Sequence, residues 1–292
     1  MKEDMKLFRR VCRKICYVFN RKIPDKLYIR MMYYVKLGKK INLKKPVMFN
    51  EKLNWLKLYD RNPQYTKLAD KYEVRNYVKD MIGEEYLIPL LGVWDSAEEI
   101  PYEKLPERFV LKCTHDSASV IICKDKDKFD RTEANEKLNK CLKTNYYWAS
   151  REWPYKNIRP RIVAEQYMED ESHTELKDYK IYCFGGKPAL IQVDFGRFVH
   201  HERNLYDTSW NYINERFEYP NNPEVQIKKP ECLEEMLILA ARLSENMPSV
   251  RIDFYSVNDR PYFGEITFYQ EGGYGKFEHE SFEKKLGDLI RL

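Results

Sequence analysis

Two segments near the C-terminal end of the chain alternate apolar and polar residues at the period of a β-strand. They are Val250–Tyr255 and Pro261–Phe268, and the intervening residues 258–260 are Asn, Asp and Arg, which favour a turn. Side chains two positions apart in a strand point to the same side, so a hairpin brings polar residues of both segments onto one face. The residues on that face are Arg251, Asp253, Glu265 and Thr267.

The chemistry of this face suits a metal ion together with a phosphate. Carboxylate and hydroxyl oxygens are hard ligands of the kind that Mg²⁺ prefers, and an adjacent arginine can neutralise a phosphoryl group. Gly272, Gly273 and Gly275 follow at once and leave the backbone open to a ligand. The alternative is a solvated hairpin face with a cross-strand ion pair, which an isolated hairpin would favour.

The remaining pattern predicts an α+β protein with a helix-rich beginning. Apolar residues recur at helical spacing in the first third of the chain, and short strand-like runs dominate afterwards. The predicted helices span 5–22, 24–38, 50–59, 66–81, 131–143 and 230–247, with Asn50 as an N-cap. The other predicted strands span 86–93, 109–113, 120–123, 162–168, 178–184 and 188–195. Asp70 and Lys71 fall inside the fourth helix, where we expect only helix-surface chemistry.

Two lysines are candidates for binding an anion. Lys112 lies near the end of a short apolar strand and precedes a loop of small residues, 114–119, whose amides can face a phosphate. This loop contains no glycine, so its spacing alone does not define a phosphate site. Lys180 shares one face of the 178–184 strand with Asp178.

The segment 5–22 is amphipathic and basic. Its apolar residues include Leu7, Phe8, Val11 and Ile15, and its basic residues include Arg9, Arg10, Arg13 and Lys14. Such a helix can lie on an anionic membrane surface. It can equally bury its apolar stripe against the helix at 24–38 and leave its charges in water. The sequence leaves both interpretations open.

Composition narrows the class of protein. The chain has 292 residues, of which 43% are hydrophobic and 33% charged, as in a globular enzyme with two lobes. The net charge of +5 accompanies no nucleic-acid-binding motif, so we expect no nucleic acid partner. The 7 cysteines include no CxxC pair, which is typical of reduced thiols in a cytosolic protein. The 23 tyrosines suit sugar and nucleotide surfaces, although tyrosine is also common in AT-rich genomes.

Taken in order along the chain, the polar residues resemble those of ATP-grasp enzymes. The set consists of Lys112, Glu165, Asp178, Lys180, Arg251, Asp253, Glu265 and Thr267. Longer stretches resemble the TupA-like branch, which is named for teichuronopeptide synthesis and met in surface-polysaccharide gene clusters. These stretches are KKPVMFNEKLNWLKLYDRNPQYTKLADKYEVRNYV, YLIPLLGVWD, LPERFVLKCTHDSAS and GEITFYQEGG, and the resemblance covers about residues 43–275.

The resemblance implies an ATP-grasp fold in which two α+β lobes sandwich a nucleotide. The expected bounds are 1–105 for a helical N-terminal part, 106–164 for the small lobe and 165–292 for the large lobe. ATP and Mg²⁺ are the implied cofactors. The residues implied to bind ATP are Lys112 and Lys180 at the phosphates, the adenine hinge Glu165, Gln166, Tyr167 and Met168, and Asp178 at the ribose.

The resemblance also implies a metal site and catalytic residues. Asp253, Glu265 and Thr267 match the metal ligands, and Arg251 and Lys180 match the cations at the phosphoryl group. Two departures from the family pattern stand out. The loop residues His115, Ser117 and Ser119, which we expect to cover the γ-phosphate, replace a glycine-bearing loop. Thr267 replaces the Asn of many relatives, and its hydroxyl is a weaker metal ligand.

The activity implied by the resemblance is ATP-dependent ligation of a carboxylate to an amine. We expect an amino acid or amine to be joined to a uronic-acid-type group of a bacterial surface polysaccharide precursor, such as a capsule. Candidate cations for this carboxylate are Arg197, His200, His201, Arg203 and Lys276. Two alternatives stay open, a glycosyltransferase of surface polysaccharide synthesis and a non-catalytic nucleotide-binding scaffold. The paired lysines and the adenine hinge favour ATP over a sugar nucleotide.

The expected location is the cytoplasm. No apolar run is long enough to span a bilayer, and no signal peptide opens the chain. The basic helix at residues 5–22 could also bring the protein into peripheral contact with the inner face of the cytoplasmic membrane.

Overall fold

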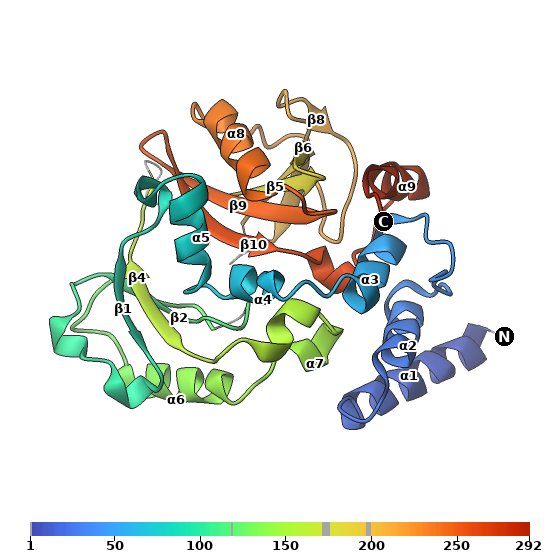
Figure 1. Cartoon of the computed structure of the whole chain (residues 1–292), viewed down its shortest axis with the longest axis horizontal. Helices are drawn as coiled ribbons and strands as arrows, with labels where there is room; N and C mark the ends of the chain where they lie inside the picture. The colour runs from blue at the N-terminus through green and yellow to red at the C-terminus, as the bar shows by residue number, and fades with distance from the viewer. Residues whose placement is uncertain (1, 118, 171–175, 197–199) are drawn as a thin grey trace.

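The computed structural model describes residues 2–117, 119–170, 176–196 and 200–292, and the side chains from residue 9 onward within these ranges. Two antiparallel sheets organise the chain, and helices of the N-terminal third pack beside them (Figure 1). The α+β class and the helical N-terminal part predicted from the sequence are confirmed. Within the described residues no helix has the length and apolar character needed to cross a membrane.

The smaller sheet has four strands in the order β1-β4-β2-β3. Their bounds are β1 Leu90–Trp94, β2 Phe109–Cys113, β3 Ile121–Cys123 and β4 Ile162–Gln166. A separate apolar cluster holds this lobe together, in which Leu138 of α6 (Arg131–Leu142) packs with Phe109 and Leu111 of β2. The strand β1 precedes residue 106, so this sheet extends beyond the predicted bounds of the small lobe.

The larger sheet has six strands in the order β10-β9-β5-β6-β7-β8. Their bounds are β5 Asp178–Phe184, β6 Lys187–Phe195, β7 Glu202–Tyr206, β8 Tyr212–Ile213, β9 Val250–Val257 and β10 Arg260–Thr267. Because side chains alternate along a strand, one face of β5 and β9 is apolar and the other polar. The apolar face, with Ile181 and Ile252 fully buried, lies under the helix α8 (Leu233–Leu243).

At one end of this second face the side chains are apolar, and the helix α3 (Phe49–Tyr59) packs against them. Phe49 packs against Tyr182 and Phe184 of β5, with ring centroids 6.5 and 6.2 Å away. The predicted N-cap is wrong by two positions, because Met48 caps this helix and Asn50 lies in its first turn. The Asn50 side chain instead donates to Gly275 O at 2.8 Å, so it ties α3 to the loop that follows β10.

The predicted helix at 66–81 is two helices, α4 (Gln64–Ala69) and α5 (Val74–Met81). Asp70 causes the break, because its Oδ1 accepts hydrogen bonds from the backbone N–H groups of Tyr72 and Glu73 at 2.8 and 3.2 Å. An aspartate that binds the backbone in this way competes with the helix and favours a turn. The turn presents Lys71 towards the space between the two sheets, where its Nζ donates to Asp116 O.

The N-terminal hairpin consists of α1 (Lys2–Val18) and α2 (Asp25–Leu37), which ends at Gly38 with φ of 74°. Arg151 anchors this hairpin to the body. Its buried guanidinium donates to Asn20 O and Ile23 O, pairs with Asp25 at 3.1 Å and lies 3.9 Å from the ring centroid of Tyr28. The remaining α-helices are α7 Tyr147–Ser150 and α9 Glu280–Leu289, and the 3₁₀ helices are Glu84–Tyr86, Ala97–Glu99, Tyr102–Lys104, Trp153–Asn157 and Gln270–Gly273.

Candidate functional site

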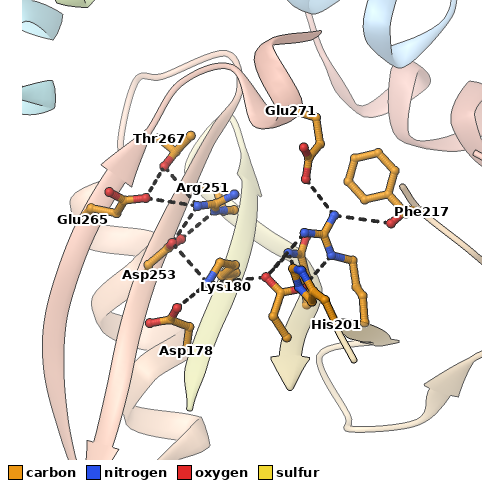
Figure 2. A network of polar contacts seen from close by, with 12 residues as sticks. Asp178, Lys180, His201, Phe217, Arg251, Asp253, Glu265, Thr267 and Glu271 are labelled. Atoms are coloured by element: carbon orange, nitrogen blue, oxygen red, sulfur yellow. Dashed lines mark hydrogen bonds and ion pairs between the residues drawn. The ribbon is translucent and has the colours of Figure 1, made fainter. Parts of the chain in front are cut away.

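The polar face of the larger sheet gathers the residues that the hairpin pattern singled out. β9 and β10 pair antiparallel as predicted, with Asp253 opposite Glu265 and Arg251 opposite Thr267. A register shift between Phe263 and Glu265 marks a bulge in β10 before these pairs. On the other side of β9, Lys180 of β5 lies opposite Asp253. Figure 2 shows these side chains converging on one patch of the sheet.

Arg251 is the centre of this patch. Its guanidinium binds Asp253 with two hydrogen bonds, from Nε to Oδ1 and from Nη2 to Oδ2, both at 2.7 Å. The same Nη2 contacts Glu265 Oε1 and Thr267 Oγ1, each at 3.2 Å. Thr267 also donates to Glu265 Oε1 at 3.0 Å, so its hydroxyl orients the glutamate. The expected contact of this hydroxyl with a metal stays a prediction.

Lys180 lies among three carboxylates on the same face. Its Nζ donates to Asp178 Oδ2 at 2.7 Å, and it lies 3.7 Å from Asp194 and 3.8 Å from Asp253. All four side chains are largely buried. The lysine therefore offsets part of the negative charge that the sheet buries, together with Arg251 at Asp253 and Arg203 at Asp194.

The two candidate metal ligands differ in their protonation behaviour. Burial raises the pKa of Asp253 to about 6, although Arg251 and Lys180 oppose the shift. Burial also acts to raise the pKa of Glu265, but Lys71, Arg251 and Lys180 outweigh it, and the net result is a lowered pKa. Both side chains are ionised at the pH of a cell, because the pKa of about 6 for Asp253 and the lowered pKa of Glu265 lie below that pH.

The carboxylates fit a metal that is shared with a nucleotide. No group of three or more His, Cys, Asp or Glu side chains in the described residues forms a metal cage. Asp253 and Glu265 supply two hard oxygen donors, and water and phosphate oxygens would complete the shell. Mg²⁺ bound to a polyphosphate uses such a donor set. The residues present therefore fit this ion.

Further cations lie at the smaller sheet and at the turn between α4 and α5. Lys112 of β2 pairs with Glu165 of β4 at 2.6 Å, and Arg75 of α5 lies 3.6 Å from the same carboxylate. Lys71 stands between the lobes, because its ammonium group interacts electrostatically with Glu265 of the larger sheet and with Lys112 and Glu165 of the smaller one. Desolvation of that ammonium lowers the pKa of Lys71, and Glu265 opposes the shift.

Lys71 is the residue that the sequence interpretation missed. Its periodicity is that of a helix surface, and only the turn at Asp70 brings it into the cleft. A signal was present in the chain, since Asp70 and Lys71 lie within the longest stretch that resembles the TupA-like branch. From helical periodicity alone, Asp70 and Lys71 are predicted to lie on the helix surface.

The loop after β2 differs from the prediction. His115 is buried, and its Nε2 lies 3.0 Å from Thr144 O and 3.2 Å from Cys141 O, at the end of α6. Ser119 donates to Asp116 Oδ1 and accepts from Cys113 N, both at 2.6 Å. These two side chains close the loop and do not face the carboxylates. The physical reason is that the loop lacks glycine and uses side chains to satisfy its backbone. Ser117 is exposed and lines a cavity beside the polar face, and its contact with the γ-phosphate stays a prediction.

The hinge segment follows directly from the edge of the smaller sheet. Gln166 is the last residue of β4, and its backbone N–H donates to Pro89 O at 3.0 Å. Tyr167 lies beneath Arg108, with the guanidinium carbon 5.2 Å from the ring centroid, and Met168 is half-buried. The hydrogen bonds expected from this hinge to adenine stay a prediction, as does the ribose contact of Asp178.

Of the residues expected to bind an acceptor carboxylate, those that the structure describes do not gather into one cationic pocket. Arg203 is held by Asp194 at 2.6 Å and by Glu271 at 2.8 Å. His201 stacks on Tyr219 and lies 3.5 Å from Asp194. His200 and Lys276 are exposed. Arg197 lies outside the described residues.

Comparison with known families places the chain in the ATP-grasp class, whose members bind ATP. A family model described as TupA-like ATPgrasp matches residues 51–291. The chain belongs to this family, because the match covers most of its length. Comparison with curated proteins gives no match.

Several solved ligase structures are similar to this chain. D-alanine–D-alanine ligase from Bacillus anthracis has 17% sequence identity and a TM-score of 0.38, over 69% of this chain and 57% of that chain. L-amino acid ligase from Bacillus licheniformis has 13% identity and a TM-score of 0.45, over 77% of this chain and 49% of that chain. D-alanine–D-alanine ligase from Helicobacter pylori has 12% identity and a TM-score of 0.41, over 83% of this chain and 69% of that chain. The chain thus spans about half the length of the first two ligases.

Proposed function

We propose that the protein is an ATP-dependent ligase that activates a carboxylate as an acyl phosphate and joins it to an amine. The observation that carries this proposal is the meeting of two carboxylates, Asp253 and Glu265, with the cations Arg251 and Lys180 of the larger sheet and Lys71 of the turn between α4 and α5. Phosphoryl transfer needs little covalent help from a protein. It needs positioning and neutralisation of the charge that spreads over the transferred group.

Each side chain has a role in this reaction. A carboxylate oxygen of the substrate attacks the γ-phosphorus of ATP, a new P–O bond forms, and the bond to ADP breaks. Arg251 and Lys180 lie on the sheet where they neutralise the transferred group, and Lys71 and Lys112 approach the phosphates from the other side. Asp253 and Glu265 would hold Mg²⁺, which neutralises charge on the phosphates when bound.

The substrate that we propose is a uronic-acid-type carboxylate of a bacterial surface polysaccharide precursor, and the nucleophile is an amino acid or another amine. Membership of the TupA-like family supports this choice. The acyl phosphate is a suitable intermediate, because the leaving group is phosphate and an amine can displace it without a further cofactor.

Hydroxylamine trapping tests the reaction without knowledge of the natural amine. The protein is incubated with MgATP, hydroxylamine and one of three probes, D-glucuronic acid, D-galacturonic acid or UDP-glucuronic acid. We expect ADP and a hydroxamate in equal amounts with at least one probe. Glucose, which has a hydroxymethyl group in place of the carboxylate, is the matched control and should give neither product.

Other outcomes would contradict the proposal. ADP release without hydroxamate for every probe excludes an acyl phosphate of these acids. Release of UDP from UDP-glucuronic acid without ADP favours a glycosyltransferase, and ATP binding without any turnover favours a nucleotide-binding scaffold.

A further inference from the structure

A cavity of about 380 Å³ opens at the edge of the polar face. Arg251, Glu265 and Thr267 form its inner end, so it adjoins the position that the reacting phosphoryl group would occupy. Its other walls come from distant parts of the chain. They are α2, the segment from Tyr146 to Tyr155, and the loop that follows β10.

The most unusual wall residue is Glu152. It is only 3% exposed, and its Oε1 accepts a hydrogen bond from Ser150 Oγ at 2.6 Å. Among the described residues, no other side chain or backbone group donates to its carboxylate. Burial raises the pKa of Glu152, and the Lys57 cation opposes this. The second carboxylate oxygen of Glu152 can therefore accept a hydrogen bond from a ligand in the cavity.

The cations near this cavity already have partners. Arg251 is bound by Asp253, and Arg203 is bound by Asp194 and Glu271 (Figure 2). Lys57 donates to Asn54 Oδ1 at 3.1 Å, to Ser150 O at 3.0 Å and to Gly272 O. Of the described residues that line the cavity, Lys36 is the one cation outside an ion pair, and it is exposed. The electrostatic match is therefore to a positively charged ligand.

Tyrosines supply much of the remaining surface. Tyr146, Tyr155, Tyr269 and Tyr274 all line the cavity. The rings of Tyr146 and Tyr155 meet edge to face, with centroids 5.0 Å apart. Aromatic faces attract ammonium groups and pack against the carbon skeleton of sugars and amino acids.

We propose that this cavity receives the nucleophile of the ligase reaction, a primary amine that enters as an ammonium ion and is bound by Glu152. The inference rests on the proposed function and adds the binding site of the second substrate.

The placement accounts for the chemistry that an amine requires. The ammonium ion transfers one proton to Glu152 and becomes a nucleophile. Its nitrogen then forms a C–N bond with the acyl carbon, the C–O bond to phosphate breaks, and the phosphate leaves. The nitrogen loses its second proton to the leaving phosphate, so an amide and hydrogen phosphate result. Glu152 returns its proton to water.

Direct binding measurements test this inference independently of turnover. The probes are D-glucosamine, D-galactosamine and the methyl esters of glycine and L-alanine, each paired with its N-acetyl derivative, which carries no charge on nitrogen. Ligand-observed NMR is recorded with wild-type protein and a non-hydrolysable MgATP analogue. We expect at least one amine to bind and its N-acetyl partner not to bind.

Variants then locate the amine. Glu152→Gln should weaken binding of that amine at least tenfold and leave affinity for the ATP analogue unchanged, whereas Glu152→Asp should retain part of the binding. Glu136→Gln, an exposed carboxylate on α6, is the matched control and should bind as the wild type does. A crystal structure of the unaltered protein with the amine gives a second readout, with nitrogen within hydrogen-bond distance of Glu152.

Three results would overturn the inference. They are equal binding of an amine and its N-acetyl partner, unchanged amine affinity in a folded Glu152→Gln protein, and failure of every amine to bind. A failed hydroxylamine assay with intact, Glu152-dependent amine binding would count against the proposed ligation alone. The two proposals can therefore fail separately.

Discussion

Asp253 is a residue whose ionisation the fold opposes and the proposed chemistry requires. Burial raises its pKa from 3.8 to about 6, in spite of the two hydrogen bonds from Arg251. A folded-state pKa above the unfolded value means that the folded protein binds the proton more tightly. The contribution of Asp253 to stability therefore falls as pH rises from about 3.8 to about 6.

Asp253→Asn tests both effects. The amide removes a charge that burial opposes, but it also leaves the buried guanidinium of Arg251 without its bidentate carboxylate, so at pH 7.5 we expect an unfolding free energy below that of the wild type. Turnover should fall at least 100-fold, because an amide is a poor ligand for Mg²⁺. Thermal denaturation and ADP release measure the two quantities, and near-normal ADP release would remove Asp253 from the metal site.

Lys71 provides a second test at the scale of a single residue. Its ammonium group lies between Glu265, Lys112 and Glu165, where a polyphosphate would pass. Lys71→Met should weaken ATP binding by about 1.5–3 kcal/mol, the range of a charged hydrogen bond. Lys67→Met, three residues short of the turn and exposed on α4, is the matched control. Equal ATP affinity of both variants in calorimetry would place Lys71 outside the nucleotide site.

At the scale of elements, α3 carries a buried polar stripe that positions the loop after β10. Asn50, Asn54 and Lys57 follow one another at helical spacing and are almost completely buried. Asn54 Nδ2 donates to Gly273 O at 2.6 Å, and Lys57 donates to Gly272 O. The loop accepts these bonds because Gly272 and Gly273 adopt positive φ of 60° and 71°, which other residues rarely do.

Lys57→Met should destabilise this arrangement. The change leaves the carbonyl groups of Ser150 and Gly272 without their donor, at a cost of about 1–3 kcal/mol each. Burial lowers the pKa of Lys57 from 10.5 to about 7, although Glu152 opposes the shift. The unfolded chain then binds more protons than the folded protein between these values, so the stability that Lys57 contributes increases with pH above about 7.

Urea denaturation of the wild type and Lys57→Met at pH 7.5 and 9.5 checks both statements. We expect the variant to be less stable at either pH, and the difference to grow at pH 9.5. A constant difference would mean that Lys57 stays charged in both states, and a difference that shrinks would mean that folding raises its pKa. Comparison of the two proteins removes the titration of the groups that do not interact with Lys57, whereas Glu152 does interact with it.

The helix α1 combines an exposed apolar stripe with basic residues. Among the described side chains of α1, Cys12 and Cys16 are buried. In contrast, the side chains of Val11, Ile15, Val18 and the following Phe19 are 46%, 39%, 58% and 50% exposed. The alternative in which the whole stripe packs on α2 therefore does not hold for these four residues. The side chains of Leu7 and Phe8 lie outside the described set.

We predict weak, salt-sensitive binding of α1 to anionic membranes. Each exposed Arg or Lys contributes about 1 kcal/mol at such a surface. The protein should sediment with anionic liposomes at low salt and be released at high salt. A Val18→Asp and Phe19→Asp double variant should remain in the supernatant, whereas Ile238→Asp, on the exposed side of α8, should sediment normally. Sedimentation of the double variant, or none of the wild type, would refute the membrane interpretation.

At the scale of the whole molecule, the two sheets contribute complementary parts of one site. Lys112 belongs to the smaller sheet and Lys180 to the larger one. Lys112→Ala and Lys180→Ala should each weaken ATP binding or turnover by about 1.5–3 kcal/mol, because each removes one charged contact. Lys187→Ala, at the exposed end of β6, should have no effect. Unchanged ATP affinity and turnover in both test variants would argue against a nucleotide held between the sheets.

The sequence determined the parts of the site that depend on local periodicity. Alternation along β9 and β10 placed Arg251, Asp253, Glu265 and Thr267 on one face, and the hairpin register brought them together. The same rule placed Asp178 and Lys180 on that side of β5. These predictions succeed because a strand has a period of two, and a short turn leaves few registers for a hairpin.

Only the tertiary structure decided which distant residues complete the site. Lys71 reaches the cleft through a turn that Asp70 creates, and it contacts Asp116, 45 positions later. His115 and Ser119 bind the small lobe because α6 and Asp116 offer partners there. Glu152 faces a cavity whose walls come from α2 and the loop after β10. Local patterns carry no information on such contacts, because packing of the whole chain sets which buried polar groups find partners and which stay available to a ligand.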